Sequence, residues 1–92
     1  MSSLKRKCEL IEKFLRNPNN VRFEELDKLL RAFGFEPRQP RKGGSHFTYR
    51  KTGGKIITVP YKRPFVKKVY VKQVIKLLDL EAYYEENCRK KS

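Results

Sequence analysis

The stretch that decides the fold reads HFTYRK (46–51), TGG (52–54) and KIITVP (55–60). Polar and apolar residues alternate through both six-residue runs, as in a strand with one face in a core and the other in water. A Gly-Gly pair between two such runs is a hairpin signal. We therefore expect an antiparallel hairpin in which Phe47 and Tyr49 face the core. His46, Thr48 and Arg50 should face solvent.

Apolar residues at helical spacing predict helices on both sides of this hairpin. One is expected over Leu4–Leu15, ending at an Asn-Pro breaker, and a second over Phe23–Phe33. A last helix should start near residues 69–71 and run on through residues 82–84. Residues 35–42 form the weakest strand candidate, because their two prolines each remove a backbone donor.

The expected order is α-α-β-β-β-α, an α+β fold with a three-stranded antiparallel sheet packed on helices. Helices on one face of such a sheet leave the other face open to solvent. A chain of 92 residues can bury one modest core. We expect a single domain over residues 1–92, with an additional helix in residues 1–20 and a frayed basic tail at residues 87–92.

Positive charge is concentrated in the middle of the chain. Residues 37–78 contain twelve Lys or Arg and no Asp or Glu, so they carry nearly all of the net charge of +13. Such a segment repels itself and favours a polyanionic partner, with nucleic acid first. An anionic membrane surface is the rival, but the segment alternates like strands rather than forming a basic amphipathic helix. A basic surface without a partner is the third alternative.

Other classes of protein lack support in the sequence. No apolar run approaches the roughly 20 residues that span a bilayer, and none of signal-peptide length follows the start. We therefore expect a cytoplasmic location. Cys8 and Cys88 lie near opposite ends, and we expect free thiols, with a disulfide between the ends as the alternative. One histidine and two distant cysteines do not make a zinc site, and no small-molecule cofactor is indicated.

His46 is the one histidine of the chain, and it follows Gly43, Gly44 and Ser45. Histidine is the side chain that normally titrates near neutral pH, so it can act as a general base or a general acid. Glycines let a backbone approach a phosphate closely. RNA cleavage without a metal needs a base, an acid and cations, so a second proton carrier is required: Tyr61, a lysine, water, or a second subunit's histidine.

Several segments in this order resemble the HicA family of toxin–antitoxin modules. They are KGGSHFTYR (42–50), ITVP (57–60) and YVKQVI (70–75), preceded by a helix ending in Gly-Phe within RFEELDKLLRAFGF (22–35). The resemblance covers about residues 22–80. It implies a double-stranded-RNA-binding-like fold and a small cytoplasmic mRNA interferase whose key residue is the histidine of Gly-Ser-His, here His46. It also implies a HicB-like antitoxin that covers the histidine face and inserts acidic groups among the cations.

The chain departs from the family pattern in three places. Gly43-Gly44 has a second glycine where many members carry a bulkier residue. Many members place a second histidine just after the Val-Pro of the third strand, whereas this chain reads Tyr61-Lys62-Arg63. The additional helix in residues 1–20 is absent from shorter members, and extra cover for the core is its simplest role.

The sequence thus predicts the toxin of a type II toxin–antitoxin system, a metal-independent endoribonuclease that cuts mRNA with His46 as general acid/base. Gly44, Ser45 and Tyr61 are supporting candidates. The residues expected to hold RNA are Arg41, Lys42, Thr48, Arg50, Lys51, Lys62 and Arg63. Phosphate contacts of this kind predict little base specificity by themselves. The alternative is a non-catalytic RNA-binding module, or an inactive toxin homologue, on the same fold.

Overall fold

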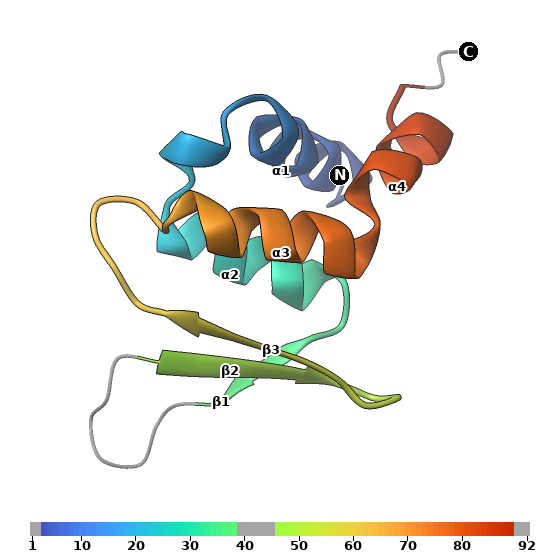
Figure 1. Cartoon of the computed structure of the whole chain (residues 1–92). Helices are drawn as coiled ribbons and strands as arrows, with labels where there is room; N and C mark the ends of the chain where they lie inside the picture. Colours follow the sequence, from blue (N-terminus) through green and yellow to red (C-terminus); the bar gives the residue numbers. More distant parts are fainter. Residues whose placement is uncertain (1–2, 39–45, 90–92) are drawn as a thin grey trace.

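A computed structural model describes residues 3–38 and 46–89 of the chain (Figure 1). The elements in order are α1 (Ser3–Arg16), a short 3-10 turn (Pro18–Asn20), α2 (Phe23–Ala32), β1 (Glu36–Arg38), β2 (His46–Lys51), β3 (Lys55–Pro60), α3 (Lys68–Leu78) and α4 (Leu80–Asn87). The α+β class and the three-stranded antiparallel sheet are confirmed. Among the described residues, no helix has the length and apolar character needed to cross a membrane.

The sheet has the order β1-β2-β3, and both pairings are antiparallel. The hairpin is confirmed with the predicted ends, and Phe47 pairs with Val59 while Tyr49 pairs with Ile57. Gly53 and Gly54 form its turn at φ angles of +106° and +91°, a backbone region that favours glycine. β1 is only three residues long within the predicted 35–42 strand, and residues 39–42 lie outside the described residues.

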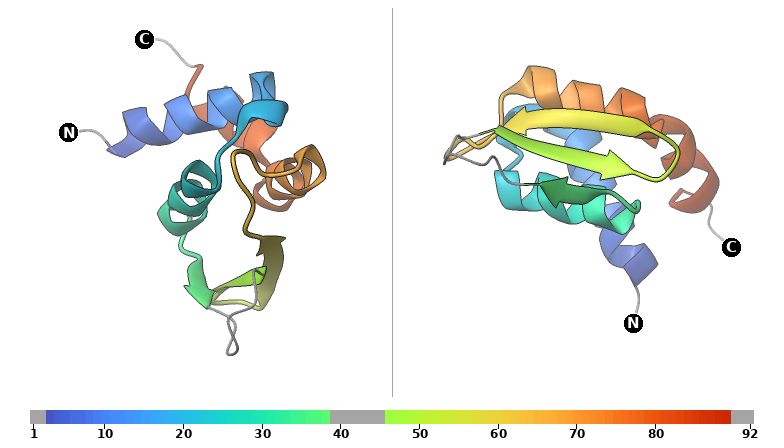
Figure 2. Two further views of the ribbon diagram at one scale, coloured as in Figure 1. Left: turned by 90° about the vertical axis from the view of Figure 1, so that its left-hand side faces the viewer. Right: turned by 90° about the horizontal axis from the view of Figure 1, so that it is seen from below.

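The helices form two layers on one side of the sheet (Figures 1 and 2). α2 and α3 cover one face of the sheet, and α1 and α4 lie beyond them. Within the described residues, the opposite face of the sheet carries no helix in any view. One apolar core joins the layers; its buried residues are Ile11, Phe14, Val21, Phe23, Leu26, Leu29, Leu30, Phe35, Tyr49, Ile57, Val59, Val66, Val71, Val74 and Leu80. The buried Tyr49 side chain adds a polar link, because its hydroxyl donates to Asp27 of α2 at 2.7 Å.

The last helix differs from its prediction. Apolar spacing alone predicts one continuous helix into residues 82–84, whereas the chain breaks at Asp79, which adopts φ +52° in the left-handed region. Asp is one of the few residues besides glycine that tolerate this conformation. The break turns α4 back toward α1, and α4 then buries Leu80 in the core.

The expectation of free thiols is wrong: Cys8 of α1 and Cys88, just after α4, form a disulfide. α1 and α4 pack against each other, and this packing brings the two Cα atoms to 5.6 Å although 80 positions separate them in sequence. Residue 88 is therefore held by the cross-link to α1, and residues 90–92 of the predicted tail lie outside the described residues.

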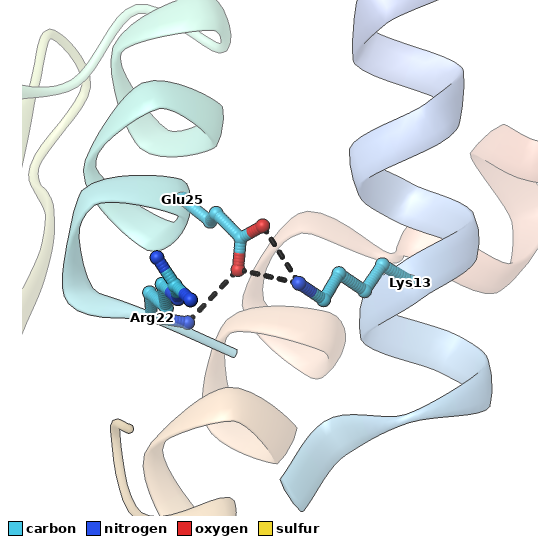
Figure 3. A network of polar contacts seen from close by, with 3 residues as sticks. All are labelled: Lys13, Arg22 and Glu25. Atoms are coloured by element: carbon cyan, nitrogen blue, oxygen red, sulfur yellow. Dashed lines mark hydrogen bonds and ion pairs between the residues drawn. The ribbon is translucent and has the colours of Figure 1, made fainter. Parts of the chain in front are cut away.

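A polar network joins α1 to the start of α2 (Figure 3). The Glu25 carboxylate accepts the Arg22 backbone N–H at 2.9 Å, and Lys13 Nζ donates to both carboxylate oxygens at 3.0 and 2.8 Å. Partial burial acts to raise the pKa of Glu25, but the hydrogen bonds from Arg22 and Lys13 outweigh it and hold this pKa below its ordinary value of 4.5.

Replacing Glu25 with Gln is expected to lower the free energy of unfolding at neutral pH by about 1 kcal/mol, because the charge-assisted bonds to Lys13 are lost. A carboxyl whose pKa is lower in the folded than in the unfolded chain stabilises the fold at pH values above its unfolded pKa. This stabilisation disappears as pH falls through the folded pKa. The difference between wild type and variant in urea titrations should therefore begin to shrink as pH falls below 4.5 and vanish once pH lies below the folded pKa of Glu25. Glu12→Gln, which breaks only the exposed pair with Arg16, should change stability by less than about 0.5 kcal/mol.

Candidate nucleic-acid interface

The solvent-exposed side of the sheet, called the open face below, carries side chains in three rows. Strand registry places Glu36, Arg50 and Ile56 side by side in the row nearest the β2–β3 turn. Arg38, Thr48 and Thr58 form the middle row, and His46 with Pro60 forms the last. Residues two apart on a strand point to the same face, so the rows follow one another at about 6.7 Å.

His46 lies at the first position of β2, and its side chain is exposed. No residue within 3–38 or 46–89 hydrogen-bonds its imidazole. The supporting candidates Gly44 and Ser45, and the RNA-binding candidates Arg41 and Lys42, lie outside the described residues. His46 is therefore open to a ligand from the solvent side of the sheet.

The middle row and the row nearest the β2–β3 turn offer hydroxyl groups and cations. Thr48 and Thr58 face each other across β2 and β3 with their hydroxyl oxygens 3.2 Å apart. Arg38, Arg50 and Glu36 are exposed, and none of them takes part in an ion pair with a described residue. Hydroxyls beside unpaired guanidinium groups suit phosphate oxygens.

Lys51 and Tyr61 lie on the helix side of the sheet; Lys51 also reaches the hollow that Glu36, Arg38 and Arg50 border at the sheet edge. Lys51 has its ammonium 5.7 Å from the Phe35 ring centre. The Tyr61 ring packs against Phe23, with centroids 4.9 Å apart, and against Phe47, which alternates to the opposite face from His46. These two predicted site residues are thus separated from the row that contains His46.

Lys62 and Arg63 follow β3 and are exposed. Arg63 Nε donates a hydrogen bond to the Tyr61 hydroxyl, and its guanidinium carbon lies 5.5 Å from the Tyr61 ring centre. This hydrogen bond raises the pKa of Arg63 above its ordinary value. The Arg63 cation is therefore held beside the end of the hairpin.

Sequence reasoning missed five residues of the open face: Glu36, Arg38, Ile56, Thr58 and Pro60. Ile56 and Thr58 could have been found, because they alternate with the core-facing Ile57 and Val59 of the predicted strand. The pairing of the proline-containing β1 could not have been found from spacing alone. Residues 3–38 and 46–89 contain no group of three or more His, Cys, Asp or Glu side chains placed to hold a metal ion.

Residues 23–80 match a protein family described as the HicA toxin of bacterial toxin–antitoxin systems. The chain belongs to the HicA toxin family. Searches of curated proteins and of solved structures returned no match. The predicted resemblance to HicA is thus confirmed, and membership implies that the chain works as the toxin of a toxin–antitoxin pair.

The HicA match runs from the first residue of α2 through the sheet and α3 to the first residue of α4. All three rows of the open face therefore lie inside it. α1 and nearly all of α4 lie outside, and these two helices pack on each other on the far side of the molecule (Figure 2). The parts of the chain beyond the HicA match are thus remote from the open face.

Proposed function

We propose that this HicA toxin is an endoribonuclease that cleaves mRNA on its open face, without a metal ion, with His46 as a general acid or base. The observation that carries the proposal is the position of the one histidine: exposed, at the end of a helix-free sheet face that also bears Arg38 and Arg50. A proton carrier beside phosphate-binding cations is the minimum equipment for this reaction.

The reaction begins when the 2′-hydroxyl oxygen attacks the adjacent phosphorus and loses its proton to a base. The bond from phosphorus to the 5′-oxygen then breaks, and an acid gives that oxygen a proton. His46 can supply one of these transfers at a time, so a lysine, water or a second subunit's histidine supplies the other. Tyr61 is the weaker candidate, because its ring packs with Phe47 on the helix side of the sheet.

The cations hold the RNA backbone while His46 acts. Arg50 and Arg38 flank the hydroxyls of the middle row, and Lys62 and Arg63 lie past the end of β3 near Pro60, the strand partner of His46. Arg41 and Lys42 precede β2 in sequence and complete the proposed set. An exposed sheet face suits single-stranded RNA, whose sugar and phosphate groups can lie along the rows.

The proposed antitoxin partner is a HicB-like protein that covers the open face and meets its cations with acidic groups. The proposed location is the cytoplasm, where both mRNA and the antitoxin would be found. A small acidic protein encoded next to this chain would support the pairing. Co-purification with it should be lost when Arg38 and Arg50 are both replaced by Glu, because charge reversal places like charges across the interface.

The direct test incubates the purified chain with a single-stranded RNA in the presence of a chelator, beside a His46→Ala variant. Cleavage by the wild type alone supports the proposal. Equal cleavage by both proteins would remove His46 from the mechanism. Tight binding without cleavage by either protein would make the chain an RNA-binding module instead.

RNA affinity is expected to fall steeply with salt, because each neutralised phosphate of a single strand contributes about −0.7 to the slope of log K against log salt. Arg50→Ala should flatten this slope by about 0.7, as measured by fluorescence anisotropy across salt concentrations. Lys76→Ala, an exposed cation in the last turn of α3, is the matched control and should leave the slope unchanged. A wild-type slope near zero would contradict the electrostatic account.

A further inference from the structure

The row of the open face farthest from His46 has a composition that phosphate binding does not explain. It combines a carboxylate, Glu36, with Arg50 and with Ile56, a large apolar side chain that is 50% exposed. Together with Arg38 and Lys51 these three residues border a hollow of about 360 Å³ beside Gly34 and the β2–β3 turn. A surface made only to hold phosphates would gain nothing from an acid and an exposed isoleucine.

Glu36 is the one acid on the open face, because no Asp or Glu occurs from residue 37 to residue 78. It lies directly opposite Arg50 in the registry, yet it takes part in none of the ion pairs among the described residues. Its carboxylate repels RNA phosphates, so its place on this face calls for a ligand group that donates hydrogen bonds.

We infer that this row is a guanine-binding subsite. Guanine alone among the four bases presents two adjacent donors, N1–H and the N2 amino group, beside two adjacent acceptors, O6 and N7. The two oxygens of Glu36 match the donors, and Arg38 or Arg50 matches the acceptors. The exposed side of Ile56 provides an apolar surface for the face of the base. The inference rests on the proposed function and adds base preference to it.

The subsite lies four residues along β2 from His46, which is about 13 Å at the rise of a strand. The bound guanine is therefore not the nucleotide whose phosphate is cleaved but one farther along the RNA. Thr48 and Thr58 lie between the two positions and face the intervening sugar and phosphate. The expected outcome is a preference for guanine at a fixed distance from the cut.

The test measures binding with the His46→Ala chain, so that the RNA stays intact. Its probes are a uridine oligonucleotide with one central guanosine and the same oligonucleotide with inosine, which lacks only the 2-amino group. We expect guanosine to bind about tenfold more tightly than inosine. Adding Glu36→Gln should reduce this ratio to below about twofold. Adding Glu86→Gln, an exposed acid on α4, should leave the ratio at about tenfold.

Three outcomes separate the inference from its rivals. If Glu36→Gln raises affinity for both oligonucleotides equally, Glu36 acts only as a repelling charge and the inference fails. If the His46→Ala chain binds both equally while the wild type cleaves both, the inference fails and the nuclease proposal stands. If guanosine binds more tightly through Glu36 but the wild type cleaves neither, the subsite stands and the nuclease proposal fails.

Discussion

Replacing His46 with alanine is expected to lower the rate of RNA cleavage by about 10²–10⁴-fold, the usual contribution of a positioned proton carrier. RNA binding should change by less than about twofold, because the proposed phosphate contacts are made by Arg and Lys side chains, which the substitution leaves in place. The side chain is exposed, so its loss should also leave the free energy of unfolding nearly unchanged. Single-turnover cleavage of a labelled RNA measures the first quantity, and anisotropy measures the second.

His46→Gln separates proton transfer from hydrogen bonding, because glutamine donates and accepts hydrogen bonds but does not titrate. It should be as inactive as His46→Ala. Full activity in the Gln variant would show that His46 only positions the RNA. Lys76→Ala on α3 controls for a general loss of positive charge and should cleave at the wild-type rate.

Removing the disulfide between Cys8 and Cys88 is expected to lower the free energy of unfolding by about 4–5 kcal/mol. The bond closes a loop of 80 residues, and a cross-link of that length strongly restricts the unfolded chain. Urea titrations without and with a reductant compare the free energies of unfolding of the oxidised and the reduced chain. Cys8→Ser should match the reduced wild type. Glu86→Gln, an exposed position on α4, changes no thiol and should remain as stable as the oxidised wild type.

The reduced chain should still fold, since Ile11 and Phe14 keep α1 packed in the core without the cross-link. This matters in the proposed cytoplasmic location, where glutathione and thioredoxin keep most thiols reduced. Equal unfolding midpoints with and without reductant would contradict the expected contribution of the disulfide. Mass spectrometry after alkylation under non-reducing conditions reports directly whether the two thiols are joined.

The hairpin was predictable because its alternation, its Gly-Gly turn and its burial all favour one register. α2 was predictable for a similar reason, since Leu26, Leu29 and Leu30 form one apolar stripe and all three are buried. The break at Asp79 was not, because the apolar pattern continues across it and only the backbone conformation differs. Local patterns predict elements, while a turn at a non-glycine residue depends on tertiary packing.

The candidate site was predictable only in part. Alternation placed Thr48 and Arg50 beside His46, but it could not show that Tyr61 packs with Phe23 and Phe47. Pairings between segments far apart in the sequence could not be predicted, for the same reason. The registry that sets Glu36 against Arg50, and the packing of α4 on α1 that joins the two cysteines, both depend on contacts between distant segments.

The central claim is that the chain cuts RNA through attack by the neighbouring 2′-hydroxyl, with proton transfer by His46. The most direct measurement is mass spectrometry of the fragment ends after digestion of a defined RNA in the presence of a chelator. The account predicts 2′,3′-cyclic phosphate and 5′-hydroxyl ends from the wild type, and intact RNA from His46→Ala. Fragments with 5′-phosphate and 3′-hydroxyl ends, or the same cyclic ends from His46→Ala, would contradict it.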